Sequence, residues 1–535
     1  MVGSLRFYLI AALSGLVLAL PYRYYDGSLP VWVALAPILW LVANAGTTRR
    51  ALACATVFSL CWTATTFSFL WHLASAGTVA LCIYTSLFYI GALWAIRRLA
   101  RRGVICAVFG TAAAWTLVEI LRSIIPVFGF PWLLLGHSLL FNDSLRQGAD
   151  LFGVYGLSFL VAAVNAWLAF VIAPKIFNPK MKWEPAVRYV TAALGLLMGS
   201  ALGYGAVRVQ SLEPKLRPGP SIAVIQGNIL QKLGRTAEEC FAQVKGHNEL
   251  HSLAISRARE AGVEPVLVCW AETMVPGALN TDDVYSKPFR DHVTEMGITT
   301  LAGSNYEIAK GPDALSSDPD SYNAAYVLDG KGKEVFHYFK RKLVPFGEYI
   351  PFTTSMPFLK ALRSVTRDQY IPGTEPSAVL TVPLGASDAD PAARYRIAMS
   401  VCVEDIHPDI AREGALAGAD TLVNITNDGW FFETYGPRAH MLAAAWRAIE
   451  TRRPLLRVTN TGHTVAVDPL GRINTLLEPW TVGTATVRLL RLPGNVPPET
   501  LYLRLGEWGS AMVFFGIFLS AFFIRKHASQ PIIPQ

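Results

Sequence analysis

The chain has 535 residues, of which 52% are hydrophobic and only 16% are charged, with a mean hydropathy of +0.35. Soluble globular proteins carry about 25% charged residues, so this composition excludes an entirely soluble chain. The net charge is +8, but the basic residues cluster beside apolar segments and form no stripe interleaved with aromatic residues, which argues against nucleic-acid binding.

The apolar residues concentrate before about residue 207 and again near the C-terminus. A spanning helix needs about 20 mostly apolar residues, and eight segments approach this length: residues 7–20, 31–45, 51–69, 79–96, 104–124, 157–172, 190–205 and 511–524. We therefore expect an α-helical membrane bundle of eight helices, with seven in a domain over residues 1–207 and one in a C-terminal segment over residues 507–535.

Basic clusters predict the orientation of this bundle. They follow the second, fourth, sixth and eighth segments, and the positive-inside rule places such clusters in the cytoplasm. The clusters are Arg49 with Arg50, Arg97 to Arg102, Lys175 to Lys182, and Arg525 with Lys526. Seven crossings then place the domain over residues 208–506 outside the cytoplasm, with both termini inside it.

A loop over residues 129–136 (GFPWLLLG) lies on the predicted outer side and is too short to span the membrane. Pro131 would interrupt a helix there. Trp132 fits an interfacial anchor of the loop or a lipid-facing element near the site, and the sequence favours neither.

The domain over residues 208–506 alternates short apolar runs with helical patterns. Strands are predicted over 221–226, 265–270, 298–302, 324–328, 396–401, 421–426, 455–459, 464–467 and 484–489, helices over 236–261, 288–296, 408–417 and 438–451, and a loop over 311–321. Continuous apolar runs indicate strands buried on both faces. The order of the elements predicts an α/β fold in which helices cover sheets.

Three residues of this domain suit nucleophilic acyl transfer. Cys402 directly follows the strand predicted over 396–401, and a nucleophile on a strand-to-helix turn is exposed beside backbone N–H groups that can bind an oxyanion. Glu272, at the end of another predicted strand, could accept the thiol proton. Lys340 could stabilise both the thiolate and the oxyanion.

Each of these residues also has an ordinary explanation. A lone cysteine at a strand end is more often an inert buried thiol, an isolated glutamate is more often solvated, and Lys340-Arg341-Lys342 alone is typical of a charged surface. Spacing along the chain does not show whether the three converge. The seven cysteines form no disulfide framework, and the sequence contains no CxxC or HExxH, so no metal or cofactor is expected.

These segments resemble the nitrilase superfamily, whose members use Glu, Lys and Cys in this chain order. With the membrane segments, nearly the full length resembles the apolipoprotein N-acyltransferase family. The segments that carry the resemblance are VIQGN (224–228), WAE (270–272), Lys340 with LVPFGEYIP (343–351), CVE (402–404), TNDGWF (426–431), His440, RPLLR (453–457) and TNTG (459–462), together with FPWL (130–133) and Pro37.

The resemblance implies a nitrilase-like αββα sandwich domain outside the cytoplasm, with Glu272, Lys340 and Cys402 as its catalytic triad. It implies transfer of an acyl chain from the sn-1 position of a phospholipid, through a thioester on Cys402, to the α-amino group of the diacylglyceryl-cysteine that begins an apolipoprotein. It also implies a monomer in the bacterial cytoplasmic (inner) membrane.

Further site residues follow from the same resemblance. Glu348 and Glu404 match acidic residues of the family, and Glu348 is expected to support Lys340 or the oxyanion. Trp132, Val403 and Trp430 are expected to contact the substrates.

The sequence departs from the family pattern in three places. Val403 stands where the family usually has Tyr, residues 232–235 lack the Trp that often follows the VIQGN segment, and Lys342 replaces a His common in nitrilase relatives. The first two departures bear on substrate contacts and not on the triad.

Two other functions stay open on the sequence alone. A membrane-tethered amidase would need only the triad and water. A non-catalytic lipoprotein-binding protein could keep the fold, and Val403 admits this alternative. A transporter is disfavoured, since Glu119 and Arg122 are the main charges within the predicted helices.

Overall fold

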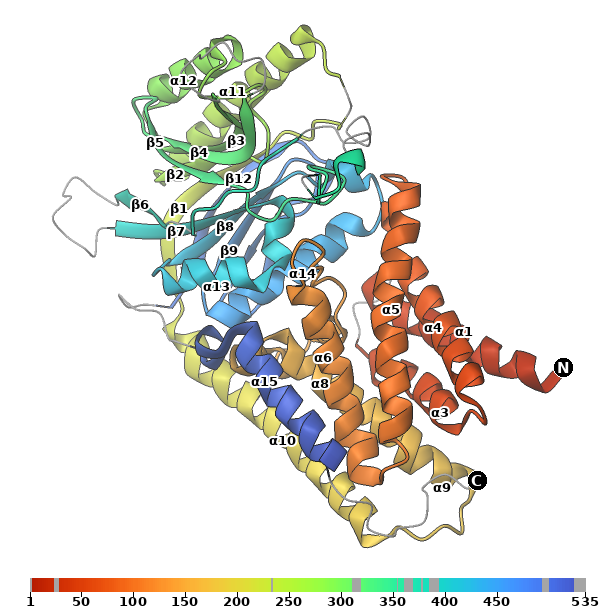
Figure 1. Ribbon diagram of the computed structural model, residues 1–535. Coiled ribbons are helices and arrows are strands. Elements are labelled where there is room, and N and C mark those ends of the chain that lie inside the picture. The colour runs from red at the N-terminus through yellow and green to blue at the C-terminus, as the bar shows by residue number, and fades with distance from the viewer. Residues whose placement is uncertain are drawn as a thin grey trace. The chain divides into compact units, whose positions relative to one another are not determined.

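The computed structural model describes residues 2–23, 28–231, 234–309, 319–353, 355–359, 369–376, 379–383, 394–492 and 500–523. The chain forms two compact units (Figure 1). Residues Met1–Glu213 and Thr500–Gln535 make up one, the helical unit, and Pro214–Glu499 make up the other, the sheet unit. Most of the loop predicted over 311–321 and the basic pair Arg525 and Lys526 lie outside the described residues.

The helical unit has helical structure in each of the eight segments predicted to span the membrane. Its main helices are α1 (Val2–Arg23), α2 (Val31–Ala34), α3 (Ala36–Asn44), α4 (Thr48–Thr66), α5 (Ser75–Leu99), α6 (Thr111–Ile124), α8 (Val154–Trp167), α10 (Pro185–Leu212) and α15 (Leu501–Phe523). Short π-helices, η2 (Cys106–Gly110) and η5 (Leu168–Ile172), precede α6 and follow α8.

Six helical stretches of the described chain are long and apolar enough to cross a membrane: Leu5–Arg23, Ser75–Leu99, Cys106–Ile124, Val154–Phe177, Pro185–Lys215 and Leu501–Phe523. The stretch Val31–Asn44, which contains both α2 and α3, is shorter. Helix α4 spans 19 residues, but Arg49, Arg50 and several hydroxyl side chains make it less apolar. Eight crossings therefore stay a prediction.

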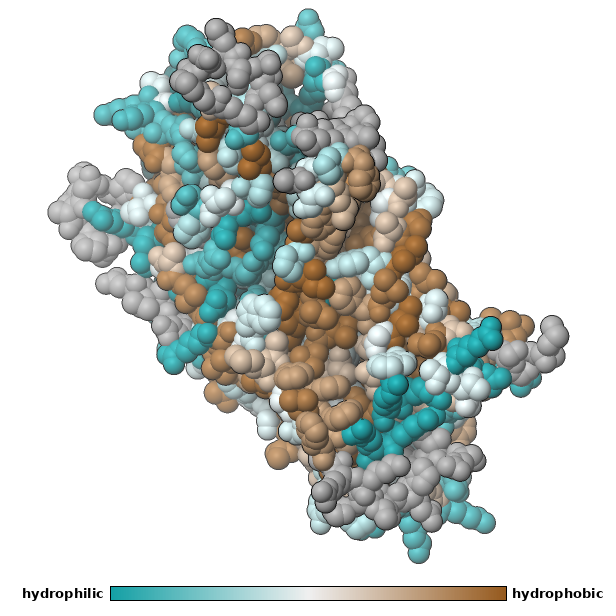
Figure 2. Space-filling model, viewed as in Figure 1, coloured by the Kyte–Doolittle hydropathy of each residue, from teal (hydrophilic) through white to brown (hydrophobic). Residues whose placement is uncertain are grey.

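Large apolar side chains are exposed along the helices of the helical unit, where Figure 2 shows hydrophobic residues gathered. Leu13 on α1, Leu87 on α5 and Leu196 on α10 are 57%, 63% and 73% exposed. Soluble proteins rarely expose apolar area on this scale, whereas the hydrocarbon of a bilayer covers it. The helical unit is therefore that of a membrane protein.

The sheet unit contains two six-stranded sheets of mixed direction. The first has the order β12-β1-β2-β3-β4-β5 with β1, β2 and β3 parallel, and the second has the order β11-β10-β9-β8-β7-β6 with β7, β8 and β9 parallel. The strands are β1 (Arg217–Gln226), β2 (Leu267–Cys269), β3 (Thr300–Ile308), β4 (Asp320–Leu328), β5 (Glu334–Phe339), β6 (Val379–Pro383), β7 (Arg394–Val401), β8 (Thr421–Thr426), β9 (Leu455–Thr459), β10 (Thr464–Val467), β11 (Ile473–Leu477) and β12 (Gly483–Arg491).

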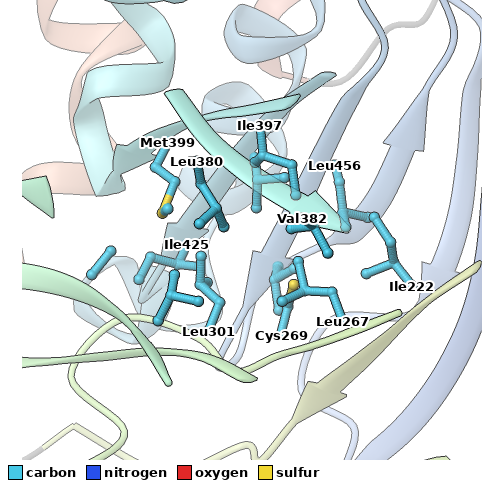
Figure 3. Close-up of a cluster of buried hydrophobic side chains, with 14 of the residues drawn as sticks. Ile222, Leu267, Cys269, Leu301, Leu380, Val382, Ile397, Met399, Ile425 and Leu456 are labelled. Atoms are coloured by element: carbon cyan, nitrogen blue, oxygen red, sulfur yellow. The ribbon is translucent and has the colours of Figure 1, made fainter. Parts of the chain in front are cut away.

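Both faces of the central strands are buried, because successive side chains point to opposite faces of a sheet. In β1, Ile222 and Val224 enter a core shared by the two sheets (Figure 3), whereas Ala223 and Ile225 enter a second core beneath two helices. Those helices, α11 (Ala237–Glu260) and α12 (Asp283–Met296), cover the first sheet, and α13 (Pro408–Leu416) and α14 (Gly436–Thr451) cover the second. The predicted αββα sandwich is confirmed.

Three strands, β5, β6 and β11, are not among the predicted ones. Each lies at the edge of its sheet, and β5 and β11 are half-exposed, so neither shows the continuous apolar run of a central strand. Helix α12 begins at Asp283 and not at the predicted Pro288, because the Asp282 side chain caps it by accepting the Val284 N–H at 2.9 Å.

Candidate active site

Cys402 lies in the turn that follows β7. The strand ends at Val401, and the 3₁₀ turn η9 (Cys402–Ile406) leads into α13. A φ of +54° at Cys402 is uncommon for a residue with a side chain, and such backbone costs about 1–3 kcal/mol. The residue is partly exposed, and the first N–H groups of a helical turn have no partner within it. The predicted strand-to-turn position of Cys402 is confirmed, and it suits a nucleophile beside oxyanion donors.

Glu272 and Lys340 extend from the first sheet toward this thiol. Glu272 follows β2 and Lys340 follows β5, and Lys340 Nζ lies 3.5 Å from Glu272 Oε1, with the two side chains only 1% and 6% exposed. The charges of both groups act on the Cys402 thiol: the Glu272 carboxylate raises its pKa and the Lys340 ammonium lowers it. The other carboxylate oxygen of Glu272 accepts the N–H of Asn427, which follows β8, at 2.9 Å. The structure thus brings together the three residues that were chosen from the sequence.

Glu348 forms a second ion pair with Lys340. Its Oε1 lies 2.7 Å from Lys340 Nζ, and its Oε2 accepts the Val344 N–H at 2.8 Å. Asn323 on β4 donates from Nδ2 to Glu272 Oε1 at 2.8 Å and to Glu348 Oε1 at 3.2 Å. One ammonium group and one amide therefore hold the two carboxylates together.

Asn323 is a site residue that the sequence does not single out. The N–H of Lys340 donates to its carbonyl at 2.8 Å, so the residue reaches the site through the pairing of β4 with β5. Because β5 is an unpredicted edge strand, only a predicted β4–β5 hairpin could have indicated Asn323.

Two family models match the chain. The apolipoprotein N-acyltransferase N-terminal domain matches residues 14–167, and the carbon-nitrogen hydrolase model matches residues 221–491. The apolipoprotein N-acyltransferase of Geobacter metallireducens is 31% identical over 488 residues, which are 88% of this chain and 86% of that protein. The chain belongs to the apolipoprotein N-acyltransferase family. Its relatives from Bradyrhizobium diazoefficiens and Azotobacter vinelandii are 31% and 30% identical over 76% and 83% of this chain, and over 71% and 79% of their own lengths.

Solved amidase structures of the nitrilase superfamily are more distant. An amidase from Nesterenkonia sp. is 19% identical, covers 51% of this chain and 91% of its own, and gives a TM-score of 0.35. This likeness adds nothing to the assignment to the N-acyltransferase family.

Burial and neighbouring charges shift the pKa of all three residues in this family member. Burial raises the pKa of Glu272, and Lys340 opposes the shift. Burial also raises the pKa of Cys402; the carboxylate of Glu272 adds to the rise and Lys340 counters it. Burial lowers the pKa of Lys340, but Cys402, Glu348 and Glu272 raise it well above its usual value. The raised pKa of Glu272 makes this carboxylate a candidate proton acceptor for the thiol, beside a lysine that stays charged.

Glu404, the second family acidic residue, joins two parts of the site. It is fully buried. Its oxygens accept hydrogen bonds at 2.6–3.0 Å from the Tyr338 hydroxyl and from the N–H groups of Val401, Arg341 and Lys342. These bonds tie the segment that carries Lys340 to the turn that carries Cys402, so Glu404 positions both.

Two of the three predicted substrate-contacting residues lie in turns that reach the site. Val403 is half-buried in η9, directly after Cys402, and Trp430 is half-buried in η10 (Asp428–Phe431), the turn after β8. The turn η10 directly follows Asn427, whose N–H binds Glu272. Contact of either side chain with a substrate stays a prediction.

The third, Trp132, lies in the helical unit and is buried. It is 2% exposed, and its ring lies 5.5 Å from that of Phe69 and 5.6 Å from that of Phe130. Arg122 donates to the carbonyl groups of Phe130 and Trp132 at 2.7 and 2.8 Å. The structure corrects the expectation of an interfacial anchor or a lipid-facing element, because the side chain packs against aromatic rings inside the unit while Arg122 holds the backbone of its loop. Contact of Trp132 with a substrate stays a prediction.

The structure shows the surroundings of Lys342, which is another departure from the family pattern. Lys342 pairs with Asp409 at the start of α13, at 2.7 Å. The absence of Trp from residues 232–235 concerns a segment whose first two residues lie outside the described chain. The preceding VIQGN segment joins the sheets, since Gln226 accepts the hydroxyls of Thr459 and Thr464 at 3.1 and 2.6 Å.

Proposed function

We propose that the chain transfers an acyl group from the sn-1 position of a phospholipid to the α-amino group of the diacylglyceryl-cysteine that begins an apolipoprotein, through a thioester on Cys402. The observation that supports this proposal is the convergence of a thiol on strained backbone, a buried carboxylate and a buried lysine in a chain of this family. The three side chains supply a nucleophile, a base and an oxyanion partner.

The first half-reaction forms the thioester. Glu272 accepts the proton of the Cys402 thiol, and the thiolate attacks the carbonyl carbon of the phospholipid ester. Lys340 and the first N–H groups of η9 stabilise the negative oxygen of the tetrahedral intermediate. The bond to the glycerol oxygen then breaks, and Glu272 returns the proton to that oxygen. The products are a lysophospholipid and an acylated Cys402.

The second half-reaction transfers the acyl group to the acceptor. The neutral α-amino group attacks the thioester carbonyl carbon, and Glu272 accepts a proton from the attacking nitrogen. The carbon–sulfur bond breaks, and the thiolate of Cys402 recovers the proton from Glu272. The thioester keeps the acyl group reactive while the two lipid substrates exchange, so they need not bind together.

The remaining predicted site residues receive supporting roles. We propose that Glu348 and Asn323 fix the side chains of Lys340 and Glu272 relative to each other through their hydrogen bonds. Val403 and Trp430 are proposed to contact the lipid portions of the substrates, at the ends of neighbouring parallel strands.

The basic clusters and the family support a location for the reaction. We propose that residues 208–506 form a catalytic domain outside the cytoplasm of a bacterial inner membrane, that residues 1–207 and 507–535 contribute eight crossings, and that both termini are cytoplasmic. The protein is proposed to act as a monomer on membrane lipid.

A labelled acyl donor tests the mechanism directly. The purified full-length chain in detergent micelles is incubated with a phospholipid radiolabelled in its sn-1 chain. We expect label on the protein that neutral hydroxylamine removes, and none on Cys402→Ser. A diacylglyceryl-cysteine peptide should discharge the label as an amide, whereas the same peptide with an acetylated α-amino group should leave it in place.

The outcomes of this experiment separate the alternatives. An unlabelled protein that hydrolyses simple amides in the same micelles would identify a membrane-tethered amidase. A protein that neither acquires label nor hydrolyses amides, but binds the peptide, would be a non-catalytic lipoprotein-binding relative.

A further inference from the structure

Four ionisable side chains form a closed network inside the sheet unit. Asp405 lies in η9, Asp428 in η10, His440 on α14 and Arg457 on β9. None of the four is more than 3% exposed. They come from four different elements, so the tertiary fold and not the local sequence brings them into contact.

Arg457 and His440 each bridge the two carboxylates. Arg457 Nε lies 2.9 Å from Asp405 Oδ2, and its Nη1 lies 2.9 Å from Asp428 Oδ2. His440 Nε2 lies 2.7 Å from Asp405 Oδ1, and its Nδ1 lies 2.8 Å from Asp428 Oδ1 and 2.7 Å from Arg457 Nη2. Two carboxylates thus face one guanidinium and one imidazole, and a proton taken up by the imidazole would balance the charge.

Stability alone gives no reason for such a network. Removing charged groups from water costs free energy, and apolar side chains of similar volume often replace buried ion networks without loss. The sheet unit has two large apolar cores, and His440 lies on a helix whose neighbouring residues are buried. What apolar side chains would not supply is a fixed, directional link between the two carboxylates.

The two carboxylates belong to the turns that carry the site. Asp405 stands three residues after Cys402 in the same 3₁₀ turn. Asp428 directly follows Asn427, whose N–H binds the Glu272 carboxylate at 2.9 Å. The positive φ of Cys402 persists only where the surrounding structure enforces it.

We propose that the Asp405–Asp428–His440–Arg457 network is a positioning device for acyl transfer, which fixes the η9 and η10 turns against each other and so holds the Cys402 thiol at the Glu272 carboxylate. The role of this network in catalysis rests on the proposed function, whereas its effect on the position of the Cys402 thiol does not depend on that function. The four are positioning residues, since they act through Cys402 and Asn427.

The test compares this network with an ion pair at the opposite ends of the same strands. Asp420 precedes β8 and accepts the N–H and Nε of Arg396, on β7, at 2.9 and 3.3 Å. The full-length variants His440→Gln, Arg457→Lys and Asp420→Asn are purified in micelles. Three quantities are measured for each: the unfolding temperature, single-turnover thioester formation from a labelled phospholipid, and the rate of iodoacetamide alkylation at Cys402, read by peptide mass spectrometry.

We expect His440→Gln to lower the maximal rate of thioester formation about 10- to 100-fold with an unchanged KM, since small misplacements of reacting groups have effects of this size. The alkylation rate at Cys402 should change in the same variant. Arg457→Lys should show a smaller loss, because lysine keeps the charge but lacks the fork that reaches both carboxylates. Asp420→Asn should lower the unfolding temperature and leave both rates per folded molecule unchanged.

Wild-type rates per folded molecule in both network variants would overturn the proposal, as would an equal loss in Asp420→Asn. If His440→Gln does not fold, Arg457→Lys decides. If the wild-type chain forms no thioester, the proposed function fails, and the alkylation rates still decide whether the network positions the thiol.

Discussion

Two groups of buried ionisable side chains in the sheet unit differ in the ratio of acidic to basic groups. Around Lys340, two carboxylates, Glu272 and Glu348, face a single ammonium group. In the network around Arg457, two carboxylates face a guanidinium and an imidazole. The unbalanced group has a carboxylate with a raised pKa that can take up a proton, whereas the balanced group holds its members in place. Similar residue types therefore have a proposed chemical role in the first group and a proposed positioning role in the second.

The largest expected effect comes from Glu272→Gln, which removes the base and keeps the shape. Thioester formation should fall about 10²- to 10⁴-fold, the usual contribution of a general base. Stability should change little, because the substitution removes one charge from a group with a negative excess. Single-turnover labelling and thermal unfolding of the same preparation measure both quantities. A variant that unfolds while its folded fraction keeps the wild-type rate would contradict a catalytic role.

The same isosteric change in the balanced group should act on stability. Asp428→Asn leaves Arg457 and His440 without one of their partners, and breaking a buried charge pair costs about 3–5 kcal/mol. In the wild-type chain, Arg457 and His440 hold the pKa of Asp428 well below its usual value, although burial acts to raise it. Denaturant unfolding in micelles gives the change in free energy. If Glu272→Gln proves the more destabilising of the two, the contrast between the groups is wrong.

The contrast extends to two buried histidines, His247 and His251, for which the described part of the chain provides no carboxylate partner. Burial lowers the pKa of His247 to about 4 and that of His251 to about 3. Burial also acts to lower the pKa of His440, but the carboxylates of Asp405 and Asp428 together raise it. A lowered folded-state pKa means that stability is complete above about pH 6.5 and is lost as the pH falls, by about 2 kcal/mol per histidine at pH 5. His440 has the opposite sign, and its contribution is lost as the pH rises through its raised value.

Unfolding free energies at pH 7 and pH 5 check this prediction. The wild-type chain should lose more stability than His251→Gln over this interval, by about 2 kcal/mol. Equal losses in the two proteins would show that His251 does not titrate in this range.

The smallest expected effect is the fall in the rate of thioester formation at acidic pH. Because its folded-state pKa is raised, Glu272 becomes protonated at a higher pH than an ordinary glutamate and loses its capacity as a base. Below that pKa, thioester formation should fall about tenfold per pH unit. Rates measured on the stable part of the pH range test it. A rate that does not change on the acid side would assign the proton to another acceptor.

The central strands were predictable because burial on both faces leaves an apolar run, as over residues 222–225 in β1. The limits of β8 (Thr421–Thr426) match the prediction. The edge strand β5 lacks that pattern. Without a predicted β5, the sequence did not indicate that β4–β5 pairing brings Asn323 to the site. The triad residues were recognisable from the family motifs, but their convergence depends on pairing between distant segments. Trp132 was placed wrongly, since an aromatic residue in a short loop does not reveal that Arg122 holds the loop inside the unit.

Glu404 anchors the chain on both sides of Lys340, through the Tyr338 hydroxyl before it and the N–H groups of Arg341 and Lys342 after it. The segment that follows residue 342 adds two further contacts to this lysine: the Gly373 N–H donates to the Lys340 carbonyl at 2.9 Å, and Glu348 Oε1 accepts from its ammonium group at 2.7 Å. Exchanges near Gly373 or Glu348 would therefore move the reacting lysine itself, whatever else they change.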